Sequence, residues 1–410
     1  MSLFKANISP IRIGAVFEIG SGSVMISIVR SDSTKIAPEI IWSKREYVPR
    51  RVNATTQTSV KNVVTSIMSA GLLLDGEGRK TLEQRYPKTK IEYIQITITA
   101  PWSFTITKII SYRNAEPFFI TEDLLEELQK AAGKKINEDL KEDTLATERG
   151  LDILTRVTTD IQANDYTITS PLGQKTSTIN LTQVAAAAPT YLISVINDIN
   201  KKILPRLKPK CFSFMLMYYC IIREIYTDIS DYCLIDITFE ATEIGIVRGG
   251  ILRYCSNTPI GISTLARTVA NVLNLPIDEA YAFLKEPYHT RALETLTADR
   301  KAQFTVIMDE YQNNIKRLFL ESGDKLSIPK TIFLHGGHQV ESFFVTQVNS
   351  SAVLATKTQH TVHQVTKELL TSNYTEAEKK ALLTITDDTA MLVAAQFFHT
   401  QQHMSDFIQI

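Results

Sequence analysis

The chain has 410 residues, of which 44% are hydrophobic and 21% are charged, as is typical of globular proteins. Its 44 Lys and Arg residues are balanced by 44 Asp and Glu residues. Because phosphate attraction needs clustered cations, this balance argues against a nucleic-acid binder, and the hydrophobic content excludes disorder as the main state. The length predicts roughly two to four structural units.

The cysteines and the apolar runs indicate a cytoplasmic protein. No CxxC pair or histidine cluster accompanies the cysteines, so neither a zinc site nor a disulfide framework is expected at Cys211, Cys220, Cys233 and Cys255. Residues 1–14 lack the apolar core of a signal peptide. The most apolar run, at 211–222, is far shorter than the ~20 residues of a membrane span, so we expect no direct span.

In the first half of the chain, alternating and helical apolar patterns predict strands and helices in succession. A β-hairpin is expected over residues 13–30, broken by a polar turn at 20–23. The next elements are, in order, a helix at 58–70, strands at 91–99 and 103–112, a helix at 121–141, strands at 151–169 and 175–187, and a helix at 190–203.

The second half opens in a similar way. After a helix at 211–226, we expect strands at 232–237 and 242–248 joined by a turn at 238–241, then a strand at 251–256. Helices follow at 262–273, 277–285 and 302–322, a short strand at 331–334, and helices at 376–383 and 389–400. Two halves in which strands and helices alternate predict α/β layers.

Three short segments carry candidate chemistry. Residues 18–23 join two strands through a turn without bulky side chains, which lets backbone N–H groups approach a phosphate. Residues 236–242 also join two strands, and the strand-end carboxylate of Asp236 can hold a hydrated Mg²⁺. The segment 332–338 contains two glycines, at 336–337, on which a flat ring can stack. Taken singly, each segment is better explained by an ordinary turn.

Together, these segments resemble the actin-like ATPase superfamily in their order and spacing. The likeness extends through residues 249–252, 259–266 and 275–285. The resemblance implies an α/β, actin-like (ribonuclease H-like) two-lobed fold that binds ATP with Mg²⁺. The implied nucleotide-binding residues are Gly20, Ser21, Gly22, Ser23, Asp236, Thr238, Thr242, Lys285, Gly336 and Gly337, with Asp236 as the Mg²⁺ ligand through water.

A smaller β-α-β-β module between the halves resembles the SHS2 insertion of the cell-division protein FtsA and of the pilus protein PilM. Tyr166 followed by a Pro-Leu-Gly turn is more similar to FtsA, whereas Asp-Ile-x-x-Glu-x-Thr at 236–242 is more similar to PilM. The expected units are a first lobe (1–89), the SHS2-like insertion (90–188), return helices with the start of the second lobe (189–265), a helical subdomain (266–328), and the adenosine-side strand with C-terminal helices (329–410).

Several residues depart from the family pattern. Thr238, Phe239 and Glu240 stand where the family commonly has glycines, so that bulk and like charge are added where a phosphate would approach. Tyr281 replaces the ribose-contacting glutamate, and no water-activating Gln or Glu can be placed in 211–232. Since phosphoryl transfer depends on positioning and charge compensation, we expect a weak or degenerate ATPase with a mainly structural role.

The resemblance implies three alternative functions. The first is an FtsA-like cytosolic scaffold of bacterial cell division that docks a tubulin-like division protein, with self-polymerisation left open. The second is a PilM-like adaptor of type IV pilus assembly that binds the cytosolic end of a membrane protein. The third, an ATP-dependent small-molecule kinase, is disfavoured by the insertion. Because residues 406–410 follow without a basic amphipathic segment, we expect a partner to recruit the protein to the inner face of the membrane.

Overall fold

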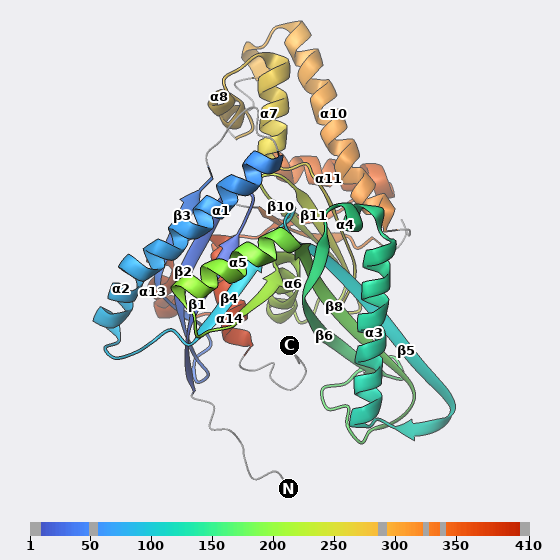
Figure 1. Cartoon of the computed structure of the whole chain (residues 1–410). Helices are drawn as coiled ribbons and strands as arrows, with labels where there is room; N and C mark the ends of the chain where they lie inside the picture. The colour runs from blue at the N-terminus through green and yellow to red at the C-terminus, as the bar shows by residue number, and fades with distance from the viewer. Residues whose placement is uncertain (1–9, 49–55, 286–292, 323–327, 337–341, 402–410) are drawn as a thin grey trace.

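The computed structural model describes residues 10–48, 56–285, 293–322, 328–336 and 342–401. These residues form two α/β lobes and an inserted sheet with a long helix across it (Figure 1). The mixed α/β architecture is the one expected from the sequence.

The first lobe is built on a five-stranded sheet with the order β3-β2-β1-β4-β9. The strands are β1 (Ile11–Ile19), β2 (Ser23–Asp32), β3 (Glu39–Tyr47), β4 (Tyr93–Ile98) and β9 (Pro209–Ser213). β1 pairs antiparallel with β2 and parallel with β4. The helices are α1 (Thr56–Leu73), the π-helix η1 (Leu74–Gly78), α2 (Arg79–Arg85), α5 (Thr190–Ile203) and α6 (Phe214–Ile225).

The second lobe repeats this topology in the order β12-β11-β10-β13-β14. Its strands are β10 (Tyr232–Ile237), β11 (Thr242–Arg248), β12 (Ile251–Thr258), β13 (Thr331–Gly336) and β14 (Thr361–Gln364). The helices that follow β10 in the chain are α7 (Ile262–Leu273), α8 (Ile277–Phe283), α10 (Ala298–Glu321), α11 (Ser342–Thr356), α12 (Lys367–Leu370), α13 (Glu376–Leu383) and α14 (Thr389–Thr400). Of these, α14 packs against β1 and β2 of the first sheet. Because β10 pairs antiparallel with β11 and parallel with β13, the turns after β1 and after β10 hold equivalent positions.

The inserted sheet lies between β4 and α5 in the chain and has the order β5-β8-β6-β7. Its elements are β5 (Phe104–Phe119), α3 (Glu122–Glu142), α4 (Thr144–Glu148), β6 (Leu151–Ala163), β7 (Tyr166–Thr167) and β8 (Lys175–Pro189). Thr121 caps α3 by accepting a hydrogen bond from the Leu124 N–H at 3.2 Å. The apolar stripe of α3, with Leu128 and Ala132, packs on Ile161 of this sheet.

Some element boundaries differ from the sequence-based expectation. β4 pairs with β1 in the first sheet, so the range 90–188 assigned to the insertion includes a strand of the first lobe. The strand expected at 151–169 divides at Asn164 and Asp165, which both have positive φ (48° and 68°). The helix expected at 211–226 starts at Phe214, because the preceding residues extend the sheet beside β4. The sequence patterns did not predict β3, β9, β14, η1, α2, α4, α11 or α12.

α6 and α14 join the two lobes through one hydrophobic core. In α6 the residues Phe214–Ile222 are all buried, and in α14 the residues from Ala390 onward are buried. A helix that is apolar on every side needs to be surrounded by protein. The core that they form includes Val16 of the first sheet and Leu234 of the second, so the lobes share an interior.

Among the described residues, we find no helix with the length and hydropathy needed to cross a membrane.

Candidate functional site

The turns after β1 and β10 touch one another directly. The backbone N–H of Glu240 donates a hydrogen bond to Ser21 Oγ at 3.1 Å. The hydroxyl of Thr238 donates to the carbonyl oxygen of Ala100, just after β4, at 3.0 Å. The facing surfaces of the two lobes are therefore joined at the point where the sequence predicted a bound phosphate.

Phe239 fills the space over the first turn. A Cβ added to Gly22 would lie 2.2 Å from Cγ of the Phe239 ring, so the ring rests on the bare glycine backbone. A glycine lets another group approach the main chain closely. In this protein the approaching group is an aromatic side chain of its own second lobe.

The N-terminus of α7 is also engaged by the turn. The N–H groups of Ile262 and Ser263 donate to the carbonyl oxygens of Thr238, at 3.0 Å, and Phe239, at 2.7 Å. A helix N-terminus is an anion-binding site when its N–H groups lack partners. A Cβ added to Gly261 would lie 2.4 Å from the Thr238 carbonyl oxygen, so a glycine is needed for this contact.

Glu240 points along α7 and forms a two-pronged ion pair with Arg267. Arg267 Nη1 donates to Glu240 Oε1 at 2.8 Å, and Nη2 donates to Oε2. The Thr264 hydroxyl donates to the same carboxylate at 3.1 Å. The repulsion of a phosphate by Glu240 that the sequence suggested is therefore compensated by a cation, since planar guanidinium matches carboxylate geometry.

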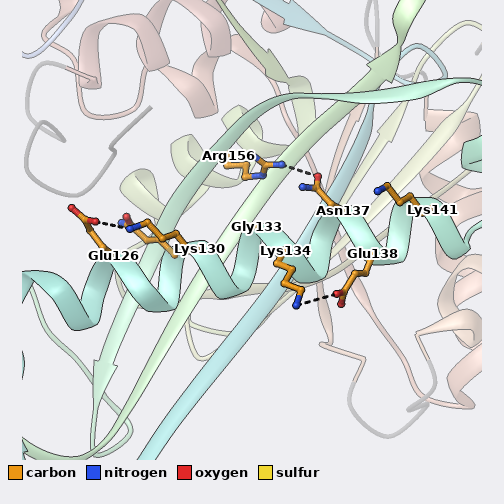
Figure 2. Close-up of a pocket in the computed structure, with 9 residues that line it drawn as sticks. Glu126, Lys130, Gly133, Lys134, Asn137, Glu138, Lys141 and Arg156 are labelled. Carbon is orange, nitrogen blue, oxygen red and sulfur yellow. Dashed lines mark hydrogen bonds and ion pairs between the residues drawn. The ribbon is translucent and has the colours of Figure 1, made fainter.

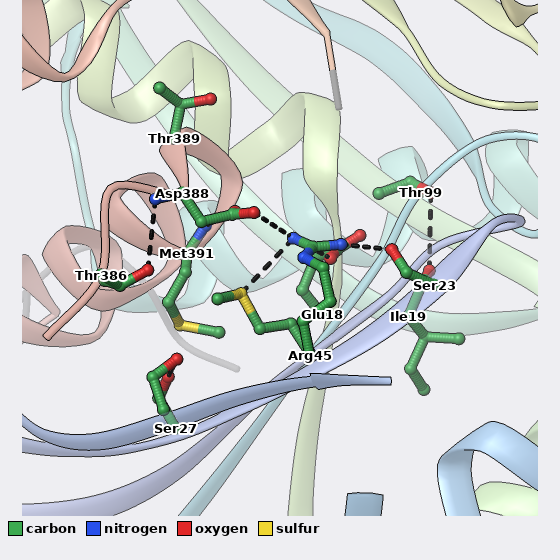
Figure 3. Close-up of polar contacts among 12 residues, drawn as sticks. Glu18, Ile19, Ser23, Ser27, Arg45, Thr99, Thr386, Asp388, Thr389 and Met391 are labelled. Atoms are coloured by element: carbon green, nitrogen blue, oxygen red, sulfur yellow. Dashed lines mark hydrogen bonds and ion pairs between the residues drawn. The ribbon is translucent and has the colours of Figure 1, made fainter. Parts of the chain in front are cut away.

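Below the turns, Arg45 bridges two buried carboxylates (Figure 3). Its Nη2 lies 2.6 Å from Asp388 Oδ2 and 3.3 Å from Glu18 Oε2. Nη1 donates to Ser23 Oγ in the first turn. Asp388 is the N-cap of α14 and accepts from the Met391 N–H at 3.0 Å, so this cluster ties β1 and β3 to the start of α14.

A second buried chain of polar side chains runs through Asp236, His335 and Thr389. His335 Nδ1 lies 2.7 Å from Asp236 Oδ1, and its Nε2 lies 3.0 Å from Thr389 Oγ1. A carboxylate oxygen only accepts, so Nδ1 donates and the threonine hydroxyl can donate to Nε2. The exposed fractions of Asp236 and His335 are 1% and 2%, and the imidazole packs on Phe214 with ring centroids 4.8 Å apart.

Two carboxyl groups beneath the turns have perturbed ionisation. Burial raises the pKa of Glu18 to about 7, and the Arg45 charge partly opposes this shift. Burial, reinforced by the charge of Asp236, raises the pKa of Glu243 to about 8. Glu243, on β11, accepts a hydrogen bond from the Thr105 hydroxyl of β5 at 3.0 Å. Acidic groups of both lobes therefore crowd into a dry interior, which disfavours their charged forms.

The remaining residues predicted for the site lie in different places. The N–H of Gly20 donates to the Ser23 carbonyl oxygen at 2.9 Å within the first turn. Thr242 is buried, and its hydroxyl donates to the Ile260 carbonyl oxygen at 2.7 Å inside the second lobe. Lys285 is exposed after α8, and Gly336 is the buried last residue of β13. Gly337 lies outside the described residues.

Comparison with solved structures identifies the fold. The structure is similar to that of a PilM–PilN type IV pilus biogenesis complex, with a TM-score of 0.55, 14% identity, and coverage of 95% of this chain and 98% of that chain. The chain has an actin-like ATPase fold. No protein-family model and no curated protein matches the sequence.

Two more distant structures also align over most of this actin-like chain. The first is the ethanolamine utilization protein EutJ from Carboxydothermus hydrogenoformans, with a TM-score of 0.43, 11% identity, and coverage of 96% of this chain and 91% of that chain. The second is a protein with actin-like ATPase fold from Bacteroides thetaiotaomicron, with a TM-score of 0.41, 8% identity, and coverage of 91% of this chain and 96% of that chain.

ATP with Mg²⁺ does not fit the side chains at the expected position of the actin-like site. The Ser21 hydroxyl and the first N–H groups of α7 bind groups of the second turn, and Phe239 covers Gly22. Asp236 is paired with His335 in the interior, whereas a hydrated Mg²⁺ needs room for its waters. Within the described residues, no group of three or more His, Cys, Asp and Glu is arranged to hold a metal.

Several residues of this site could not be found from the sequence. Arg45 lies on the unexpected strand β3, and Asp388 is more than three hundred residues away in the chain. In the sequence, His335 stands out only by its spacing from His338, and two histidines alone make a weak metal signal. An aspartate immediately before a helical pattern is an N-cap signal, and it could have singled out Asp388.

A hollow of about 710 Å³ lies elsewhere, over α3 of the insertion (Figure 2). Four of its charged side chains form ion pairs, Glu126 with Lys130 and Glu138 with Lys134. Glu126 and Lys130 lie 2.8 Å apart, and Arg156 Nη2 donates to Asn137 Oδ1 at 2.8 Å. Exposed pairs of this kind contribute little to stability, and we interpret the hollow as a solvated face of α3.

Replacing Phe239 by alanine is expected to lower the free energy of unfolding by about 1–3 kcal/mol, because a half-buried ring that packs on Gly22 is lost. Urea unfolding followed by circular dichroism measures the change. Phe119→Ala is the matched control, since Phe119 is 62% exposed, and we expect it to change stability by less than about 0.5 kcal/mol. Equal effects of the two changes would contradict the contact between the turns.

Proposed function

We propose that this chain is an actin-like adaptor that acts by binding proteins and does not depend on ATP turnover. The observation that carries the proposal is the direct bond between the two turns, Ser21 with Glu240, beneath the ring of Phe239. A bound nucleotide was expected to link the two lobes. In this arrangement a hydrogen bond of the protein itself links them. A fixed angle between lobes is what a scaffold needs, and catalysis is not required for it.

The partner that we propose is the cytosolic end of a membrane protein, as for a PilM-like adaptor of type IV pilus assembly. The similarity to the PilM–PilN complex covers 95% of this chain and 98% of that chain. Such a partner would bring the protein to the inner face of the cell membrane. The inserted β-α-β-β sheet would then correspond to an SHS2 module.

An FtsA-like scaffold of cell division is the second candidate, because the same fold and insertion are expected of it. Fold likeness at 14% identity does not separate the two. A small-molecule kinase is disfavoured by the covered turn and by the internal pairing of Asp236.

Peptide binding tests the proposal. Labelled peptides would represent the cytosolic end of a PilN-type protein and the terminal tail of a tubulin-like division protein from the same genome. By fluorescence anisotropy, we expect the first peptide to bind with a dissociation constant on the order of micromolar, equally with and without ATP and Mg²⁺. A scrambled peptide is the control.

The opposite outcomes are also informative. Binding of only the division-protein tail would support the FtsA-like scaffold. A requirement for ATP, or transfer of phosphate to a sugar in a substrate panel, would refute an adaptor that is independent of nucleotide.

A further inference from the structure

We propose that Arg45 is a built-in cation that takes the place of a divalent metal beneath the two turns, so that the lobes stay joined without nucleotide or metal. The inference rests on the proposed function, an adaptor that does not need a nucleotide. It specifies which side chain allows the lobes to stay joined without one. It concerns the isolated protein and not its partner.

The contacts of Arg45 are those of a cation at the centre of a ligand set. The guanidinium contacts Asp388 Oδ2 at 2.6 Å, Glu18 Oε2 at 3.3 Å and the hydroxyl of Ser23. In Figure 3 these side chains converge on the guanidinium from β1, from the start of β2 and from the start of α14. The side chain of Arg45 is only 10% exposed, so water screens these interactions weakly.

The carboxylates around Arg45 need a cation. Glu18 and Asp388 are 4% and 9% exposed, and burial of a charge is costly unless it is paired. Asp236 is also close enough for its charge to act on Glu18. Glu18 Oε2, whose contact with Arg45 is an ion pair, and Asp236 Oδ2 are buried and accept no hydrogen bond. Oxygens of this kind are the ligands that Mg²⁺ prefers, and here the positive charge comes from Arg45.

Arginine is suited to this place because its charge is permanent and its donors form a rigid, planar fork. Asp388 is oriented for it, since its other oxygen caps α14 through the Met391 N–H. The hydroxyl of the next residue, Thr389, is hydrogen-bonded to Nε2 of His335, which lies on the second sheet. The first turn of α14 is thus held by Arg45 of the first lobe and by His335 of the second, which ties both lobes to one helix end.

The test replaces Arg45 by methionine, which keeps the length of the side chain and removes the charge. By differential scanning fluorimetry, we expect the melting temperature to fall by about 5–10 °C and to recover in part when millimolar MgCl₂ or MnCl₂ is added, because the metal can then bind the freed carboxylates. The wild type is expected to show no shift with MgCl₂ or with ATP and MgCl₂. Arg79→Met, in an exposed pair with Asp75, is the matched control and is expected to respond to neither.

Four results would overturn the inference. The first is that Mg²⁺, alone or with ATP, stabilises the wild type, and the second is that the R45M variant is as stable as the wild type. The third is that neither metal raises the melting temperature of R45M. The fourth is that the R79M control shows the same loss and recovery of melting temperature as R45M. If R45M does not fold, R45M/D388N replaces it, since asparagine still caps the helix. The double variant is expected to fold and to lose the response to metal, and its failure to fold would also contradict the inference. None of these readouts depends on peptide binding, so failure of the adaptor function is recognised separately.

Discussion

Changing His335 to alanine is expected to lower the free energy of unfolding by about 3–5 kcal/mol, because Asp236 would keep a buried charge without its partner. The ring that packs on Phe214 would be lost as well. Chemical denaturation at neutral pH measures the change. If Asp236 instead faced solvent as a ligand for hydrated Mg²⁺, the loss of His335 would have little effect on stability.

Two comparisons make this result specific. His363→Ala, on the exposed part of β14, removes a ring that stacks on Phe333 but leaves no buried carboxylate without a partner, so it is expected to cost less than His335→Ala. The double change of His335 and Asp236 to alanine should cost less than the sum of the two single changes, because it removes both the charge and its partner. Additive effects would mean that the two side chains do not act as a pair.

Replacing Glu243 by glutamine is expected to change how stability depends on pH. In the folded protein the pKa of Glu243 is raised from 4.5 to about 8, so between these values the folded state holds a proton that the unfolded state has released. The folded state therefore loses stability as the pH rises through this window, by an amount on the order of 4–5 kcal/mol at its upper end. Glutamine cannot ionise and removes this loss.

Melting temperatures of the wild type and the Glu243→Gln variant from pH 4.5 to pH 9 test this expectation. The two proteins should differ little near pH 4.5, and the variant should be the more stable one above pH 8. Below pH 7 both should retain a slope from Glu18, whose pKa is raised to about 7. Parallel curves at all pH values would show that Glu243 is not the group that titrates.

Local patterns in the sequence were sufficient for the elements that form largely from their own residues. α5, α7 and α14 begin and end where apolar periodicity and breakers predicted. The hairpins after Ile11 and Tyr232 follow from alternation around polar turns. The order of the three candidate segments then indicated the actin-like fold, which the structural comparison supports.

Short strands at the edges of the sheets needed the tertiary structure. β9 has only five residues and β14 only four, too few for a clear alternation, and each exists because a parallel neighbour pairs with it. The place of β4 in the first sheet is a further example, since its apolar sequence is equally suited to a strand of the insertion. Pairing partners far away in the chain leave no local signal.

For the candidate site too, some features followed from the sequence and others only from the tertiary structure. The sequence by itself identified Gly22 and Phe239 as turn residues and indicated that a phosphate would meet unexpected bulk there. Only the folded chain decided that the ring of Phe239 covers the glycine, that Asp236 turns inward to His335, and that Arg45 meets Asp388. The reason is physical: a buried charge is stable only beside a partner, and partners separated by hundreds of residues are brought together by packing, which a local pattern does not encode.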